Sequence, residues 1–183
     1  DGIFQSGRYL KEMEDIFRKE GLPLELTRLP FVESSFNLKA RSKVGASGIW
    51  QFMRTTARAY LRMDACADER NDPLRSTVAA ARKLRNNFEM LQNWPLAVTG
   101  YNHGPSGVQR MVQKYQTTQL AELTDIRKNR FGFASANFYA SFLAAIAVER
   151  DAEKYFGPLP RMLELRGVEV RLDKGLKVAQ LLK

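Results

Sequence analysis

Three prolines, Pro73, Pro95 and Pro105, each stand at the head of a segment with helical character, and they constrain this chain more than any other feature. Asp72 precedes the first as a capping residue, and Gly104 separates the second segment from the third. Proline is favoured in the first turn of a helix and disfavoured inside one. The sequence therefore predicts three successive helices, over about 72–92, 94–102 and 105–115.

Helical spacing of apolar residues extends this pattern on both sides. Ser6 could cap a helix that Gly21 stops, and Pro30 lies inside a second expected helix, which it would kink. The expected helices outside the proline-headed block cover 6–20, 24–36, 55–61 and 134–155, with a further turn at 119–123. The helix expected over 134–155 is the most apolar of these, so we expect it to be the central helix of the fold.

The character of the chain changes after residue 157. Residues 168–172 alternate as a short strand would, and 176–183 could form a helical turn or two. Residues 37–48 lack periodicity and predict a structured loop, as do 129–132, while 64–71 form a polar connection. We therefore expect one all-α domain over 1–157 and a small C-terminal appendage or linker over 158–183.

Charge narrows the class of partner. The 183 residues carry a formal net charge of +9, which favours an anionic partner. The basic residues are spread out and no nucleic-acid motif occurs, so we do not expect nucleic-acid binding. With a single His and a single Cys, a zinc site built from those ligands is excluded. We expect no metal or cofactor, and Cys66 as a small buried residue.

Glu33 is the best candidate for chemistry because apolar residues, Phe31, Val32 and Phe36 among them, surround it in the sequence. Such surroundings can keep a carboxyl group protonated near neutral pH. On one helix Glu25 would lie about 12 Å away, too far for a glycosidase carboxylate pair, which needs about 5 Å or about 6.5–9.5 Å. Taken alone, an isolated glutamate of this kind is more often a surface residue or a buried ion-paired one than a catalytic acid.

Four separated motifs change this assessment. They are Glu33-Ser34-Ser35-Phe36-Asn37 with Ser42, then 45–53 (GASGIWQFM), then 100–105 (GYNHGP), and 131–142 (FGFASANFYASF). Together they resemble the lytic transglycosylase family of peptidoglycan-cleaving enzymes, in order and spacing. The match is greatest to the soluble lytic transglycosylase catalytic domain, and 22–37 resembles its membrane-bound murein transglycosylase D branch. The resemblance covers about 20–155 and implies a lysozyme-like helical fold.

The resemblance also implies roles for single residues. Glu33 matches the one catalytic acid, and Ser42 matches a serine that contacts the sugar N-acetyl group. The implied substrate-binding positions are Ser42, Gln51, Met53, Tyr101, Asn102 and Tyr139, the two tyrosines with hydroxyls near Glu33. The chain departs from the family pattern at Ile49-Trp50 and at Gly100, and its fourth motif lacks a Glu-Thr-Arg opening. These departures affect the substrate subsites more than the reaction. Trp50 is a candidate for the groove, Trp94 for the core, and His103 for a helix end.

The implied reaction is non-hydrolytic cleavage of the β-1,4 bond between N-acetylmuramic acid (MurNAc) and N-acetylglucosamine (GlcNAc), with Glu33 as acid and then base and with 1,6-anhydro ends as products. The implied partner is the peptidoglycan glycan strand, bound by a monomeric, exported protein of the periplasm or cell envelope. Any leader or membrane anchor would lie outside this sequence. A hydrolytic muramidase, a non-catalytic glycan-binding module and a nucleic-acid binder remain as alternatives.

Overall fold

The computed structural model describes residues 1–125 and 132–165, and within them the fold is helical, which confirms the predicted class. Three isolated β-bridges occur in the loops of this part, and no strand does. The elements are α1 Gly2–Ser6, α2 Leu10–Lys19, the 3-10 helix η1 Leu24–Arg28, α3 Leu29–Glu33, α4 Arg54–Ala57, the 3-10 helix η2 Glu69–Asn71, α5 Pro73–Leu91, α6 Trp94–His103, α7 Pro105–Tyr115, α8 Leu120–Asp125, α9 Phe133–Arg150 and α10 Ala152–Phe156.

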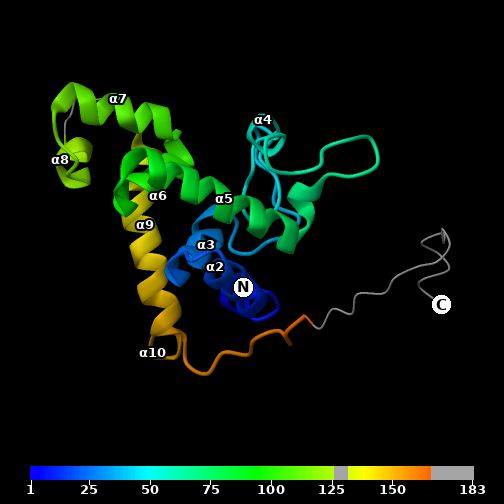
Figure 1. Cartoon of the computed structure of the whole chain (residues 1–183). Helices are drawn as coiled ribbons and strands as arrows, with labels where there is room; N and C mark the ends of the chain where they lie inside the picture. Colours follow the sequence, from blue (N-terminus) through cyan, green and yellow to red (C-terminus); the bar gives the residue numbers. More distant parts are fainter. Residues whose placement is uncertain (126–131, 166–183) are drawn as a thin grey trace.

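The three proline-headed helices form as predicted. The Asp72 side chain accepts from the backbone N–H groups of Leu74 and Arg75, which caps α5. Asn93 caps α6 through the N–H of Leu96. α5, α6 and α7 follow one another in space, and α6 also packs on α9 (Figure 1). This helical block is the frame on which the other elements rest.

Two cores hold the fold together. The larger lies where α2, α5, α6 and α9 meet the loop after α3, and Trp50, stacked on Phe17 at 5.9 Å between ring centroids, lies in it. The Trp50 Nε1–H donates to Thr77 Oγ1 at 2.9 Å, so the indole is both buried and satisfied. The smaller core joins α6, α7 and α8 through Leu96, Val108 and neighbours. The prediction that Trp50 lines the groove was therefore wrong, because its ring is wholly enclosed.

The N-terminal helices differ from the expected boundaries. The helix expected over 6–20 begins at Leu10, and Ser6 ends α1 by donating to the carbonyl of Ile3 at 2.8 Å. A Cβ at Gly7, where the chain turns, would lie 2.7 Å from the carbonyl oxygen of Met162. Glycine at this position therefore leaves room for the C-terminal segment that crosses it.

The helix expected over 24–36 is split in two. η1 runs to Arg28 and α3 begins at Leu29, so Pro30 lies in the first turn of α3 and causes no kink. A proline has no N–H to donate, and its place in a first turn costs no helical hydrogen bond. α3 ends at Glu33, and Ser35 and Phe36 take left-handed φ values of 51° and 58°. The predicted conflict at Pro30 is thus resolved by a new helix start.

Three further expectations need correction. α9 is not central, because it lies along one side of the molecule (Figure 1). Among the α9 side chains that the structure describes, Phe138 and Phe142 are the large ones that are buried. α4 ends at Ala57, four residues before the expected end. Cys66 is exposed, because its loop is held by Asp64 instead of by burial.

The described part of the C-terminal segment lies against the N-terminus. Met162 N–H donates to Phe4 O and Leu165 N–H to Arg8 O, both at 2.9 Å. Arg161 pairs with Glu149 of α9 at 2.9 Å. Residues 129–131 of the loop expected over 129–132 lie outside the described residues, as do the expected strand at 168–172 and the expected turns at 176–183. The division at residue 157 stays a prediction.

Candidate functional site

Glu33 ends α3 and faces a cavity of about 720 Å³. The residues that line this cavity are Glu33, Ser42, Val44, Ala46, Gln51, Met53, Thr56, Tyr60, Lys83, Asn87, Tyr101, Asn102, His103, Gly104 and Pro105. Six of the seven predicted site residues are therefore brought together. Among the described residues that line it, Glu33 is the one acid.

The end of α3 is fixed by its neighbours. The Ser34 hydroxyl donates to the carbonyl of Ile49 at 2.8 Å, which joins α3 to the loop that carries Gln51 and Met53. Phe31 and Phe36 meet edge to face at 4.7 Å between ring centroids. Since Ser35 and Phe36 turn the chain away through left-handed backbone, Glu33 stays at the last helical position and at the cavity wall.

The loop over residues 40–53 is built around Gly48 and Arg70. Gly48 has φ +78°, and a Cβ there would lie 1.9 Å from the carbonyl oxygen of Arg70, so a larger residue cannot occupy the position. Arg70 N–H groups donate to Gly45 O at 2.8 Å and Phe52 O at 3.1 Å. The loop, which the sequence predicts to be structured, is therefore held at both sides.

Ser42 and Gln51 each have part of their hydrogen-bonding capacity engaged in the loop. Ser42 Oγ accepts from Ala46 N–H at 2.9 Å, which leaves its hydroxyl proton to donate. Gln51 Nε2 donates to Gly48 O at 2.8 Å and to Ala40 O at 3.2 Å. These two hydrogen bonds fix the side-chain amide of Gln51, whose backbone takes a left-handed φ of +47°. Both side chains are fixed at the cavity before any ligand arrives.

The end of α6 supplies the opposite wall. Tyr101 is buried, and its hydroxyl donates to the carbonyl of Trp50 at 2.9 Å. Asn102 Oδ1 accepts from the Ser135 hydroxyl of α9 at 2.8 Å, and His103 Nδ1 lies 3.2 Å from the same hydroxyl. Since that proton is used toward Asn102, a hydrogen bond to His103 requires the tautomer protonated at Nδ1. His103 is thus a helix-end residue, as predicted, that also lines the cavity.

Lys83 is the charged cavity residue, besides Glu33, that the sequence did not lead us to expect; Thr56, Tyr60 and Asn87 were not expected either. Lys83 comes from α5, and its ammonium donates to the carbonyl of Tyr101 at 2.8 Å and lies 3.6 Å from the centroid of the Tyr101 ring. The Phe52 ring is 5.6 Å from the same ammonium. One signal was available: Lys83 lies three residues after Ala80 and four before Asn87, both buried, and so on the buried stripe of α5.

Burial and charge shape the acid–base behaviour of the site. Burial raises the pKa of Glu33 to about 7, and the charge of Lys83 opposes this rise. Burial lowers the pKa of Lys83 to about 8, against the effect of Glu33. The pKa of Tyr101 lies well above its usual value because of burial and the charges of Glu33 and Tyr60. Burial also lowers the pKa of His103, and Arg110 adds to the effect.

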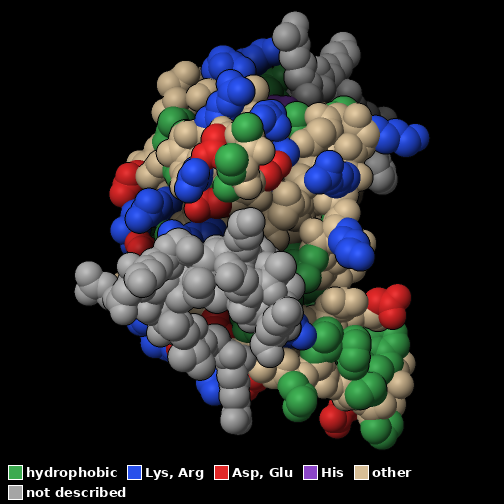
Figure 2. Space-filling view, turned by 90° about the vertical axis from the view of Figure 1, so that its right-hand side faces the viewer, with side chains coloured by type: hydrophobic (Ala, Val, Ile, Leu, Met, Phe, Trp, Pro, Cys, Tyr) green, Lys and Arg blue, Asp and Glu red, His purple; other side chains and the backbone are tan. Residues whose placement is uncertain are grey.

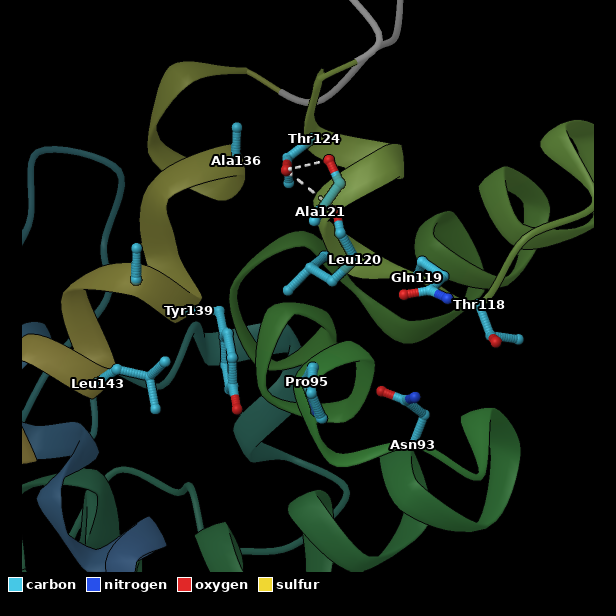
Figure 3. Close-up of a pocket in the computed structure, with 11 residues that line it drawn as sticks. Asn93, Pro95, Thr118, Gln119, Leu120, Ala121, Thr124, Ala136, Tyr139 and Leu143 are labelled. Atoms are coloured by element: carbon cyan, nitrogen blue, oxygen red, sulfur yellow. Dashed lines mark hydrogen bonds between the residues drawn. The ribbon is translucent and has the colours of Figure 1, made fainter.

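Tyr139 is the predicted site residue that does not line the cavity of Glu33. It lines a separate cavity between α6, α8 and α9, where its ring lies beside Pro95 and Leu143 (Figure 3). The face of α9 that carries Ser135, Phe138 and Phe142 is the one turned toward α6 and the main core. One residue along a helix turns the side chain by about 100°, so Phe138 takes the inward direction expected for Tyr139.

The other aromatic candidates are also placed. Trp94 packs against the main core and stacks on Phe88 at 4.3 Å between ring centroids, as predicted. No group of three or more potential metal ligands occurs in the described part of the chain. In residues 1–125 and 132–165, no helix is both long and apolar enough to cross a membrane.

Comparison with known proteins gives one family. The model of the transglycosylase SLT domain family matches residues 14–123. Membrane-bound lytic murein transglycosylase D of Escherichia coli K12 is 29% identical over 166 residues, which are 89% of this chain and 36% of that protein. This chain thus spans about a third of its curated relative.

Two solved structures share the fold. An inactive mutant of the lytic transglycosylase Slt from Pseudomonas aeruginosa has a TM-score of 0.61 at 20% identity, over 81% of this chain and 24% of that one. The 70 kDa soluble lytic transglycosylase SLT70 of Escherichia coli has a TM-score of 0.59 at 21% identity, over 74% and 24%. The predicted lysozyme-like helical fold is therefore confirmed. With the family model covering more than half of its length, the chain belongs to the transglycosylase SLT domain family.

Proposed function

We propose that this chain is the catalytic domain of a peptidoglycan lytic transglycosylase, which cleaves the β-1,4 bond between MurNAc and GlcNAc without water. The observation that carries the proposal is a single carboxyl group, Glu33, whose pKa burial raises to about 7 in a preformed cavity. At such a pKa both the acid and the carboxylate are populated near neutral pH. The site then holds a group that can give a proton and take one back.

In the first step Glu33 donates its proton to the leaving O4 of GlcNAc as the glycosidic bond breaks. The N-acetyl carbonyl oxygen of MurNAc attacks the anomeric carbon and gives an oxazolinium-like intermediate. The substrate thus provides the nucleophile that a second carboxylate provides in most retaining glycosidases. We assign the orientation of that N-acetyl group to Ser42, whose hydroxyl proton is free to donate.

In the second step the Glu33 carboxylate removes the proton from the 6-hydroxyl of the same MurNAc. The 6-oxygen attacks the anomeric carbon, the N-acetyl oxygen leaves, and a 1,6-anhydro ring closes. The proton balance is complete, since Glu33 ends protonated as it began. Lys83 stabilises the carboxylate between the steps, because its charge favours the ionised form of Glu33.

Substrate binding is proposed for Ser42, Gln51, Met53, Tyr101 and Asn102, which share the cavity. Tyr139 stays a predicted substrate-binding residue, although it lines a different cavity from Glu33. The peptidoglycan substrate places the enzyme in the bacterial cell envelope, and a monomer with no cofactor suffices for the mechanism. An anchor in the membrane would lie outside this sequence.

The product profile tests the proposal. Purified sacculi digested with the protein are analysed by mass spectrometry, and 1,6-anhydro ends, lighter by one water than reducing ends, are expected. Glu33→Gln is expected to lose at least about a thousandfold in rate, in line with removal of a general acid–base. Glu25→Gln, an exposed acid in the preceding 3-10 helix, serves as the control and retains activity.

Other outcomes select the alternatives. Reducing ends in place of anhydro ends would identify a hydrolytic muramidase. Full lysis by Glu33→Gln would contradict a catalytic role for this acid, and tight glycan binding without any lysis would indicate a binding module. A gel-shift assay with duplex DNA at physiological salt tests the nucleic-acid alternative, and no shift is expected.

A further inference from the structure

A second hollow opens beside the cavity of Glu33. It measures about 530 Å³ and is also lined by Ser42, Val44, Ala46 and Met53, so the two hollows share one wall. Four cations line it and, among the described residues, no acid does; we call Arg41, Lys43, Arg54 and Arg70 the basic pocket. A ligand lying over Ser42 in the first cavity therefore adjoins this positive region directly.

Arg70 builds the pocket and is itself compensated. Its side chain is only 7% exposed, and two of its nitrogens donate to the carboxylate of Asp68, at 2.9 and 2.7 Å. The third nitrogen, Nη1, donates to the carbonyls of Gly45 and Phe52. Four of the five N–H groups of a guanidinium are thereby used. Arg70 holds the loop, and its charge is largely neutralised by Asp68.

Arg41, Lys43 and Arg54 are the exposed cations of the basic pocket. They are exposed, and no ion pair or side-chain hydrogen bond of theirs occurs within the described residues, whereas Lys11, Arg18 and Arg62 each pair with an acid. Arg54 acts on Asp68 only at longer range, as one of the charges that hold its pKa low. Three positive charges thus stand unpaired at one end of the groove.

Lys and Arg side chains also predominate over acids on the upper half of the face shown in Figure 2. The protein is basic as a whole, with a net charge of +9. A general positive field attracts any polyanion and steers it with a dependence on salt. The basic pocket is more specific, because its charges border the wall that the sugar would contact.

We infer that the basic pocket binds the carboxylates of the peptide carried by the sugar strand, and that the domain therefore prefers peptide-bearing strands to bare glycan. This inference rests on the proposed function. The sugars of the strand carry no charge, whereas the peptide attached to the lactyl group of muramic acid carries free carboxylates. Arg41 and Arg54 offer the planar fork that binds a carboxylate in a bidentate manner, and Lys43 adds a point charge.

Binding by a protein that does not cleave tests the inference. All variants are made in the Glu33→Gln background, and the affinity for a defined soluble strand is measured with its peptides and after their enzymatic removal. The background protein is expected to bind the peptide-bearing strand more tightly. The triple variant R41Q/K43Q/R54Q is expected to lose about tenfold for that strand, the sum of three exposed charge contacts, and to bind the bare strand unchanged.

The matched control is K19Q/R82Q/K114Q, which removes three exposed cations that line neither hollow. It is expected to keep the preference for peptides. Equal weakening by both triple variants would overturn the inference, since net charge would then explain the effect. Equal binding of both strands by the background protein would overturn it too, as would competition by a DNA oligonucleotide equal to that of the free peptide. Thermal unfolding of both triple variants verifies that the fold is intact.

The same experiment separates this inference from the proposed function. If the protein prefers peptide-bearing strands but yields no cleavage products from sacculi, the inference about the basic pocket stands and the proposed catalytic function is refuted. If the protein produces anhydro ends at equal rates from both strands, the proposed catalytic function stands and the inference about the basic pocket is refuted.

Discussion

Replacing Lys83 with methionine removes the positive charge that opposes the effect of burial on Glu33. Methionine keeps most of the apolar stem of lysine, so the packing against Tyr101 and Phe52 is largely retained. A charge of opposite sign within about 4–6 Å lowers the pKa of a carboxyl group by about 1 to 3. Because Lys83 donates its hydrogen bond to the carbonyl of Tyr101, we take the lower end of that range.

The pKa of Glu33 is therefore expected to rise by about one, which corresponds to about 1.4 kcal/mol. This rise is measured by ¹³C NMR titration of the labelled carboxyl group, which Glu33→Gln identifies by its absence. Tyr60, Tyr101 and His103 face the same cavity, and their own titrations are followed in parallel. The alkaline limit of the pH–rate profile should move in the same direction, while the maximal rate falls about tenfold because the carboxylate is less stabilised.

Two variants decide whether the effect is local. K83R retains the charge and is expected to restore most of the rate. R82M removes the neighbouring exposed cation of α5 and should leave the pKa of Glu33 unchanged. An unchanged or lower Glu33 pKa in K83M would refute the reasoning, and so would an equal rise in R82M.

The remaining predictions concern stability and the loop. Folding raises the pKa of Glu33 from 4.5 to about 7, so ionisation of Glu33 lowers the stability of the fold as pH rises between these values. In urea unfolding, E33Q should therefore be more stable than wild type above pH 7, by at most about 3 kcal/mol, and the difference should be smaller at pH 4. Thr77→Val leaves the buried Trp50 Nε1–H without its acceptor and should cost about 1–3 kcal/mol, whereas Thr77→Ser should cost less in the same assay. Gly48→Ala brings a Cβ against Arg70 O at 1.9 Å and should abolish lysis of sacculi, while Gly45→Ala, with open space around its Cβ but φ +92°, should be milder.

The helices headed by proline were predictable because their signals are local. A cap residue, a proline in the first turn and a regular apolar stripe are all read within one segment, as at Asp72 and Pro73. The error at Pro30 has the same origin: proline indicates a helix start as well as a kink, and the local sequence does not distinguish the two. The preceding residues form a 3-10 helix, a pattern that apolar spacing at 3.6 residues does not reveal.

The site was less predictable, because its residues are selected by packing between distant segments. The motif residues from Glu33 to Asn102 could be grouped by resemblance, and the structure does bring them to one cavity. Tyr139 could not be placed, since the direction of its side chain depends on how α9 rotates against α6. Phe138 and Ser135 face inward because the buried stripe of α9 continues to Phe142.

Lys83 shows why a site with one acid needs a nearby positive charge as well as apolar surroundings. Burial alone would drive the pKa of Glu33 so high that the acid would give up its proton reluctantly, whereas a direct ion pair would keep it ionised and useless as an acid. A lysine held by the Tyr101 carbonyl and two aromatic rings supplies an intermediate influence on Glu33. The Glu33 pKa of about 7 thus results from opposing effects of burial and of the Lys83 charge. It depends on residues of α3, α5 and α6 together, so the sequence of no single segment reveals it.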